Sequence, residues 1–299
     1  MARTLEEAGY DSLWVSDHIV LPETIRSRYP FSEDGIATWP TDSPYFDALI
    51  ALALAAAATE RVRLGTAVLV LPLRNPVQFA KQAASIDVAS NGRLELAVGA
   101  GWLEEEFDAL GVPFKQRGTR MVEWLAIARD CWSGRTRGHS SVRYELAADT
   151  LCLPTPAHQI PVMIGGHSPL AIGRAGTVGD GWLAQHDAHS LDPDEIERAI
   201  ATMQEAAREA GGDGSVKPRV VLRIVGSMGK AAEVAKGLPA LARAGVDEVI
   251  VDVPVELDGA KRDLDVLRAG AAQSLGQGPR IASKGLDQGA RPSSEAAGR

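Results

Sequence analysis

An acidic residue and a histidine stand side by side at Asp17 and His18, directly after a short apolar run that is typical of a β-strand. A carboxylate can orient an imidazole, and a histidine can donate or accept a proton near neutral pH. The pair therefore predicts acid–base catalysis. The alternative is that His18 is a structural residue that only satisfies hydrogen bonds at the end of the strand.

A glycine-rich turn occurs at Gly165, Gly166, His167 and Ser168, between a strand pattern and a helix pattern. Free backbone N–H groups and the helix dipole at such a turn would face an anion, so the turn predicts a phosphate site. The alternative is an ordinary strand-to-helix turn in which Ser168 is the N-cap.

A second small-residue turn, Gly99, Ala100 and Gly101, precedes Trp102. Small residues remove the side chains that would keep a flat ligand away from the backbone, so this turn is a candidate ligand contact. Its spacing is not that of a dinucleotide-binding fingerprint. Trp102 either covers a ring or packs in the rim of the fold.

Strand and helix patterns alternate along the chain, which predicts parallel strands joined by helices and a single (β/α)8 barrel domain over residues 1–273. The expected helices are Asp47–Ala58, Pro76–Ala89, Arg117–Trp132, Pro169–Ala175, Asp192–Ala210 and Ala231–Ala244. The expected strands are Ser12–Ser16, Arg63–Val70, Leu94–Val98, Pro161–Ile164, Gly181–Ala184, Arg219–Val225 and Glu248–Val251.

Seven strands are one too few for a closed barrel of this type. Residues Thr4–Gly9 have the pattern of the end of a helix, so we expect the first strand of the fold to be missing at the N-terminus. A missing strand would leave two unpaired edges in the sheet. Residues 274–299 are rich in Gly, Ser, Pro and Arg, so they are expected to form a disordered tail.

The connection Ile19–Phe46 is long for a loop and carries several aromatic residues, which favours a functional loop over a packed surface excursion. The net charge of -8 comes without a basic block, so we expect no nucleic-acid partner. Two cysteines in no metal-binding spacing and the absence of a long apolar stretch predict a cytoplasmic protein without a membrane contact. Helix patterns rich in alanine and leucine are compatible with a homodimer.

The ordered set of motifs resembles the luciferase-like monooxygenase superfamily, in particular its F420-dependent oxidoreductases. The similarity spans about Leu5–Val253. The motifs are Gly9–His18, Glu60–Thr66, Asn75–Arg93, Gly99–Trp102 with Glu106 and Phe107, Arg117 with Gly118, Gly165 with Gly166, and Gly179–Trp182.

The resemblance implies a barrel that binds coenzyme F420, or alternatively FMN, in its mouth, with the phosphate near Gly165. It implies a cis peptide bond between Ala67 and Val68 against one face of the ring, and a catalytic role for Asp17 and His18. Some relatives use a glutamate where this chain has Trp102, so the acid among Glu104, Glu105 and Glu106 is left open. Three cations are expected near the acidic tail of F420: Arg26, Arg28 and Arg74.

The resulting hypothesis is hydride transfer between F420 and a small-molecule substrate held under the Ile19–Phe46 loop. A reduced-FMN monooxygenase that uses O2 is the nearest alternative on the same fold. A zinc-dependent hydrolase is a distant alternative, with a ligand set drawn from the ends of strands: His18, His167, His186 and Asp252. A barrel that binds a cofactor without catalysis is the remaining alternative.

Overall fold

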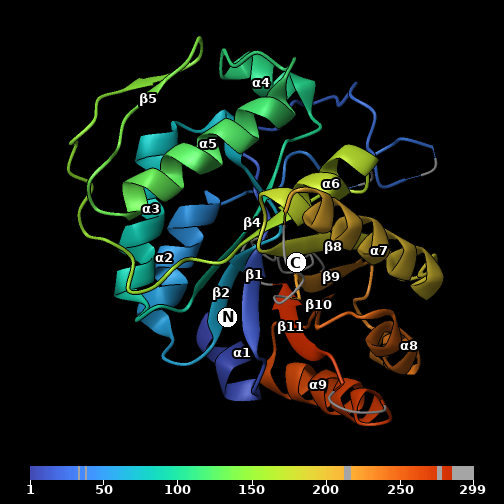
Figure 1. The fold of residues 1–299 in the computed structure, drawn as a ribbon. Helices are drawn as coiled ribbons and strands as arrows, with labels where there is room; N and C mark the ends of the chain where they lie inside the picture. Colours follow the sequence, from blue (N-terminus) through green and yellow to red (C-terminus); the bar gives the residue numbers. More distant parts are fainter. Residues whose placement is uncertain (33, 38, 212–216, 275–277, 285–299) are drawn as a thin grey trace, which may run out of the picture.

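The computed structural model describes residues 1–284, apart from residues 33, 38, 212–216 and 275–277. Its centre is a closed ring of parallel strands in which β2 and β3 together fill one position (Figure 1). The order around the ring is β2, β1, β11, β10, β9, β8, β7 and β4, and β2 pairs again with β4. The strands of the ring are β1 Ser12–Val15, β2 Arg63–Thr66, β3 Leu69–Val70, β4 Leu94–Gly99, β7 Val162–Gly165, β8 Gly181–Asp187, β9 Arg219–Val225, β10 Glu248–Asp252 and β11 Arg280–Lys284.

Helices surround this ring on the outside, as the alternating sequence patterns predicted (Figure 1). They are α1 Ala2–Ala8, α2 Ala48–Ala58, α3 Pro76–Ala89, α4 Glu104–Ala109, α5 Arg117–Trp132, α6 Pro169–Thr177, α7 Pro193–Glu209, α8 Ala231–Ala244 and α9 Leu257–Ala271. A 3-10 turn, Leu71–Leu73, follows β3, and a small hairpin, β5 His139–Ser140 with β6 Glu145–Leu146, follows α5. Among the described residues, no helix combines the length and the apolar character that a bilayer crossing requires.

The expected (β/α)8 barrel is confirmed, but the expected open edges are wrong. Strand β11 lies between β1 and β10 and is parallel to both, with Ala282 opposite Ser12 on one side and Ile250 on the other. Residues 280–284 therefore close the ring, although they fall within the segment expected to be a disordered tail. These five residues contain only a short apolar run, which does not predict a strand by itself. They become a strand because they pair with β1 and β10, which lie far away in the sequence. Residues 275–277 and 285–299 of that predicted tail lie outside the described residues.

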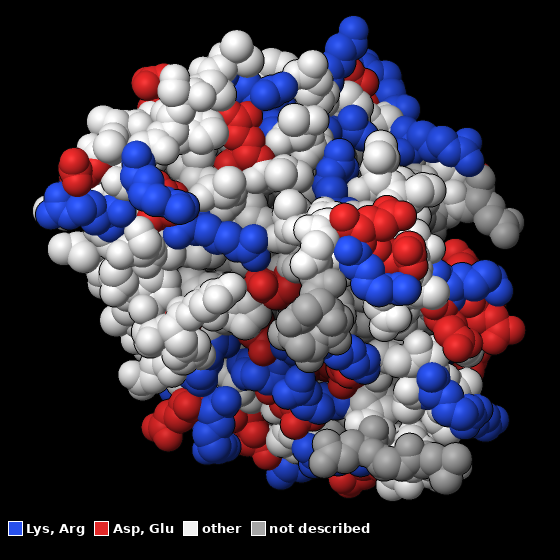
Figure 2. Space-filling model, viewed as in Figure 1, with Lys and Arg blue, Asp and Glu red and all other residues white. Residues whose placement is uncertain are grey.

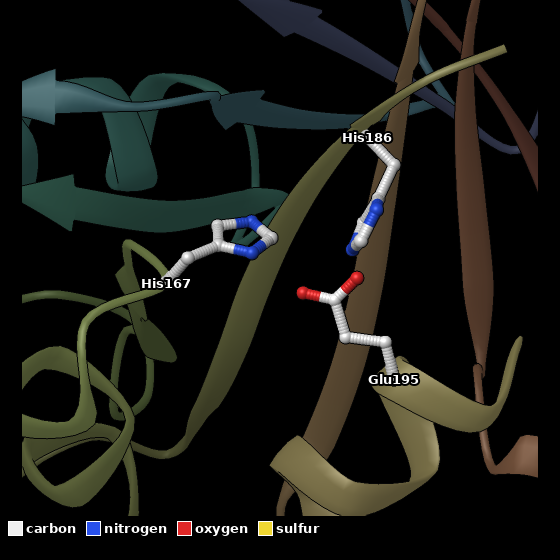
Figure 3. Close-up of side chains that lie close together, drawn as sticks. All are labelled: His167, His186 and Glu195. Atoms are coloured by element: carbon white, nitrogen blue, oxygen red, sulfur yellow. The ribbon is translucent and has the colours of Figure 1, made fainter. Parts of the chain in front are cut away.

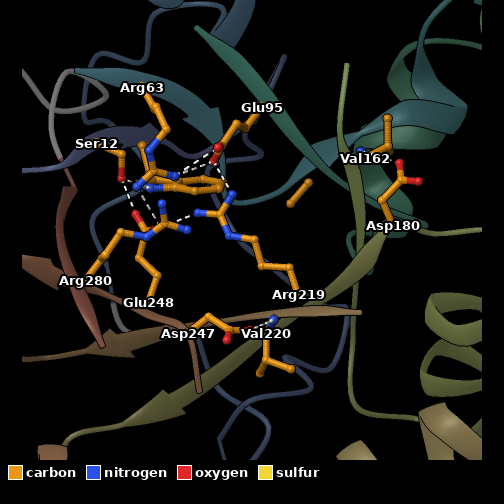
Figure 4. Close-up of polar contacts among 12 residues, drawn as sticks. Ser12, Arg63, Glu95, Val162, Asp180, Arg219, Val220, Asp247, Glu248 and Arg280 are labelled. Carbon is orange, nitrogen blue, oxygen red and sulfur yellow. Dashed lines mark hydrogen bonds and ion pairs between the residues drawn. The ribbon is translucent and has the colours of Figure 1, made fainter. Parts of the chain in front are cut away.

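The N-terminal end of the barrel is filled by a buried network of charged side chains (Figure 4). Glu248 is fully buried and pairs with Arg63 and Arg219, while Arg63 also binds Glu95 at 2.8 Å. Burial alone would raise the pKa of Glu248, but the two guanidinium groups and the hydroxyl of Ser12 outweigh that effect and lower it. Because every carboxylate of the network faces a cation, no buried charge is left unpaired and the network links β2, β4, β9 and β10 at this end of the barrel.

Above this network, an apolar layer occupies the middle of the barrel. Its members come from the strands around the ring: Trp14, Ala67, Ala97, Met163, Leu183, Val221, Ile250 and Ala282. On most strands, the next residue that faces the inside of the barrel lies at the C-terminal rim, where barrel enzymes place their reacting groups. On the outer surface, acidic and basic side chains are interspersed over the face shown in Figure 2, so the net negative charge is not gathered there.

The Ile281→Ala substitution tests closure by β11. Ile281 is 2% exposed, so its truncation should lower the free energy of unfolding by about 2 to 5 kcal/mol. Urea denaturation measures this change, and Val142→Ala, at a side chain 98% exposed, is the matched control with a change within about 0.5 kcal/mol. Equal stability of the two variants would show that residues 280–284 are not part of the barrel.

Candidate active site

A cavity of about 1460 Å³ opens at the C-terminal ends of the barrel strands. Its floor is made by one residue from each position of the ring: Ser16, Ala67, Gly99, Gly165, Gln185, Arg223, Asp252 and Lys284. Three neighbouring positions, directly after β2 and at the ends of β4 and β7, carry alanine or glycine, whereas the remaining positions carry polar or charged groups. The floor is therefore flat on one side and polar on the other.

The flat side is built around Val68. The peptide bond between Ala67 and Val68 is cis, as the family resemblance implied, and it separates β2 from β3 where one continuous strand was expected. A Cβ atom on Gly99 or Gly165 would lie 2.7 or 2.5 Å from the side chain of Val68, so both positions require glycine. Val68 thus forms a shelf without taller neighbours, against which a planar ligand can lie.

Asp17 supports the site from beneath. The carboxylate of Asp17 accepts a hydrogen bond from the backbone N–H of Val70 at 2.9 Å and pairs with Arg74 at 2.7 Å. Arg74 also pairs with Asp47, the N-cap of α2, at 2.8 Å. Burial raises the pKa of Asp17, and the cation of Arg74 opposes this rise. Both oxygens of Asp17 are engaged, so the carboxylate ties the end of β1 to Val70 and Arg74, and its expected part in catalysis stays a prediction.

His18 is held by a buried glutamate that the sequence left open among three candidates. Oε2 of Glu106 lies 3.3 Å from Nδ1 of His18, and its other oxygen accepts the backbone N–H groups of Ile19 and Val20. Glu106 is 1% exposed. Because Nδ1 faces this carboxylate, Nε2 is the nitrogen of His18 that a ligand in the cavity can use.

Aromatic rings surround the imidazole of His18 on the side of the long loop. The ring centroids of Tyr45, Trp102 and Trp39 lie 5.8, 6.3 and 6.4 Å from that of His18. Trp102 also contacts Tyr29, at 5.1 Å between centroids, and lines the cavity. Trp102 therefore lines the cavity and packs against the loop, and its expected contact with a ligand ring stays a prediction.

Glu105 fixes the long loop over the cavity. Its carboxylate accepts the backbone N–H groups of Arg26 and Ser27, at 2.7 and 3.1 Å, and the hydroxyl of Ser27. Burial would raise the pKa of Glu105, but the hydrogen bonds from Ser27 and the backbone outweigh it and lower the pKa to about 2. The carboxylate is therefore ionised, and able to hold the loop, throughout the neutral pH range.

The glycine turn after β7 also lies on the cavity wall, as predicted. Gly166 has φ of +124°, a conformation that favours glycine, and its carbonyl accepts a hydrogen bond of 2.8 Å from Nε1 of the buried Trp182. The hydroxyl of Ser168 accepts the backbone N–H of Ala171 and caps α6. Trp182 therefore fixes the glycine turn from behind, and the backbone N–H groups of the turn lie at the start of α6.

Two arginines that were not expected near the cofactor provide positive charge in the cavity, and one of them lies on α6, the helix that follows this turn. Arg117, at the start of α5, and Arg174, on α6, both line the cavity. The guanidinium of Arg174 packs on Gly118, where a Cβ atom would lie 2.7 Å from its nitrogens. Only tertiary structure brings α5 and α6 together here, although Arg117 and Gly118 belong to the family motifs.

The three arginines expected near the cofactor tail do not line the cavity. Arg74 is committed to its two aspartates, and the side chain of Arg26 is 82% exposed beside Glu105. Arg28 has a partner of its own, and its side chain packs on Gly35 of the same loop. Arg26 and Arg28 lie on the long loop outside the cavity lining, whereas Arg74 follows the 3-10 turn after β3 and is held there by its two aspartates.

Two histidines from the zinc hypothesis meet in space, but not with the proposed partners. Among the described residues, His167 and His186 approach Glu195, whose carboxylate lies between their rings in Figure 3. His18 and Asp252 are not part of this group. Nε2 of His167 accepts the backbone N–H of Gln185 at 2.9 Å, so the proton of the neutral ring resides on Nδ1. His167 therefore offers no free lone pair to a metal, and the proposed zinc set is wrong.

Comparison with known proteins agrees with this architecture. A family model described as luciferase-like monooxygenase matches residues 1–288. The chain belongs to the luciferase-like monooxygenase family.

Three similar proteins illustrate the family. An uncharacterised protein of Mycobacterium tuberculosis is 35% identical over 211 residues, or 71% of each chain. An F420-dependent glucose-6-phosphate dehydrogenase of Beutenbergia cavernae is 30% identical over 85% of this chain and 71% of its own. The fold is similar to that of an F420-dependent secondary alcohol dehydrogenase solved with an F420-acetone adduct. That structure has a TM-score of 0.61 and 20% identity, and the match covers 95% of this chain and 86% of the dehydrogenase.

The Glu105→Ala substitution tests how the loop is held. Loss of this carboxylate should accelerate hydrogen exchange at the amides of Arg26 and Ser27 by roughly tenfold or more, because their acceptor disappears. Exchange mass spectrometry on peptides from the loop measures this rate. Glu104→Ala is the matched control, since only the backbone of Glu104 contacts Ser27. Identical exchange in both variants would contradict the assigned role of Glu105.

Proposed function

We propose that this protein is an oxidoreductase that uses coenzyme F420 to transfer a hydride to or from a small organic substrate. The observation that carries the proposal is the placement of His18 in the same cavity as the Val68 shelf and the glycine turn before α6. The names of relatives support the choice of F420, since family members about 30% identical are F420-dependent dehydrogenases.

The residues around the cavity fit such a cofactor. A flat ring needs a shelf without projecting side chains, which Val68 provides beside Gly99 and Gly165. A phosphate needs free N–H groups and positive charge, which the Gly166 turn and Arg174 provide. The carboxylates of the F420 tail would need further cations, and Arg117 lies on the same wall of the cavity.

In this proposal, the bound cofactor supplies the hydride chemistry, and the protein supplies binding, orientation and proton control. His18 holds or donates a proton at Nε2, because Nδ1 faces the carboxylate of Glu106. Asp17 and Arg74 fix the strand ends that position His18. The loop held by Glu105 and Glu106 covers the site and keeps water from the reacting atoms.

A titration of the purified chain with oxidised F420, followed by the fluorescence of the cofactor, tests this proposal. We expect saturable binding of F420, with weaker or no binding of FMN in a parallel titration. The Gly165→Val variant should lose at least about tenfold in F420 affinity, because the added side chain meets Val68. Tight binding of FMN with no binding of F420 would refute the choice of cofactor.

The His18→Asn substitution tests the proton role. The turnover number should fall by roughly 10² to 10⁴ while the dissociation constant of F420 stays within about twofold of the unmodified chain. His189→Asn is the matched control, because His189 is exposed and contacts Lys230 outside the cavity. Unchanged turnover in the His18 variant would remove the histidine from the mechanism.

A further inference from the structure

We infer that the substrate is an uncharged, largely apolar carbonyl compound, such as a cyclic ketone or enone, or the matching secondary alcohol. The inference rests on the proposed function and adds the substrate class. It excludes a phosphorylated sugar, the substrate named for two relatives of this chain.

The first observation is the aromatic wall above His18. Tyr29, Phe31, Trp39 and Tyr45 of the long loop line the cavity together with Trp102. Their rings contact one another, with centroid distances of 4.9 Å between Tyr29 and Trp39 and 6.0 Å between Trp39 and Trp102. A wall of this kind gains most from covering apolar surface, and edge-to-face contacts favour a planar or ring-shaped ligand.

The second observation is the charge of residues 29–46, the part of the long loop that carries these aromatic rings. Residues 29–46 contain no Lys, Arg or His, but they contain Glu33, Asp34 and Asp42. Asp42 lines the cavity. A phosphate dianion beneath this segment would be repelled by the carboxylate of Asp42, and the cation that acts on the segment, Arg223 near Tyr29, is already hydrogen-bonded to the floor of the cavity.

The third observation is that the cations elsewhere around the cavity have other roles. Arg223 donates to the hydroxyl of Ser16 at 3.1 Å and to the carbonyl of Ala67 at 2.9 Å on the floor. Lys284 has a partner of its own. Arg117 and Arg174 lie on the wall assigned to the cofactor phosphate and tail. The substrate side of the cavity thus presents aromatic rings, Asp42 and His18, and its cation, Arg223, is hydrogen-bonded to the floor.

The chemistry of hydride transfer identifies the polar group that such a substrate needs. In the reductive direction, the carbonyl carbon takes a hydride from the reduced cofactor, and the carbonyl oxygen takes a proton from His18. The carbonyl becomes a secondary alcohol, and the cofactor is oxidised. A single oxygen next to an otherwise apolar skeleton therefore satisfies both the histidine and the aromatic wall.

The first experiment measures specificity with the chain loaded with cofactor. Reduced F420 is mixed with cyclohexanone or cyclohex-2-enone, and oxidised F420 is mixed with glucose 6-phosphate or cyclohexanol, while the absorbance of oxidised F420 is followed. We expect turnover of the cyclic compounds, with kcat/KM at least about a hundredfold above that for glucose 6-phosphate. Oxidation of glucose 6-phosphate at an equal or higher efficiency, or no turnover of any cyclic compound, would overturn the inference.

The second experiment needs no turnover and tests the aromatic wall directly. Cyclohex-2-enone should quench the tryptophan fluorescence of the chain in a saturable way, and Trp39→Ala should weaken its binding by about tenfold or more. Ile36→Ala is the matched control, since Ile36 belongs to the same loop but is 60% exposed and does not line the cavity. Equal affinity in the two variants would contradict the role of the wall, and circular dichroism verifies that both are folded.

The two proposals fail in different ways. If F420 does not bind while enone binding depends on Trp39, the cofactor assignment is wrong and the apolar substrate site stands. If F420 binds tightly and glucose 6-phosphate is the preferred substrate, the proposed function stands and the substrate class is wrong.

Discussion

Closure of the sheet into a ring is the constraint on which the rest of this structure depends. Each parallel strand then ends at the same rim, so side chains separated by hundreds of residues surround one cavity. Closure requires β11, whose backbone bonds to both β1 and β10 and whose residue Lys284 reaches the rim. At the opposite end, the buried charges around Glu248 lock the same strands together. The N-terminal end of the barrel thus holds the charge network and the C-terminal end holds the cavity, as in barrel enzymes.

The cavity itself combines two surfaces with different physical character. On the side of β4 and β7, missing side chains at Gly99 and Gly165 create a shelf around Val68, and the nearby helix N-terminus and arginines favour an anion. On the side of the long loop, aromatic rings and Asp42 surround His18. This division suits the proposed reaction between a flat, anionic cofactor and a more apolar substrate. The cofactor would meet positive charge on one side, and the substrate would meet aromatic rings on the other.

Two adjacent glutamates couple the loop to the barrel. Glu106 joins His18 to the start of the loop, and Glu105 holds Arg26 and Ser27 further along it. Both carboxylates come from the short helix after β4, so His18, the proposed proton donor, and the cover of the cavity share one support. A displacement of α4 would therefore affect proton transfer and water exclusion together.

The sequence by itself determined the periodic parts of this protein and the ends of its strands. The helices Pro76–Ala89 and Arg117–Trp132 and the strand Arg219–Val225 were predicted with their observed bounds, because local periodicity defines them and Asn75 caps the first of the two helices. Tertiary structure decided what depends on distant partners. It made a strand of Arg280–Lys284, which has no strong local pattern, and it chose Glu106 among three neighbouring acids, because only one carboxylate reaches His18 when the barrel closes.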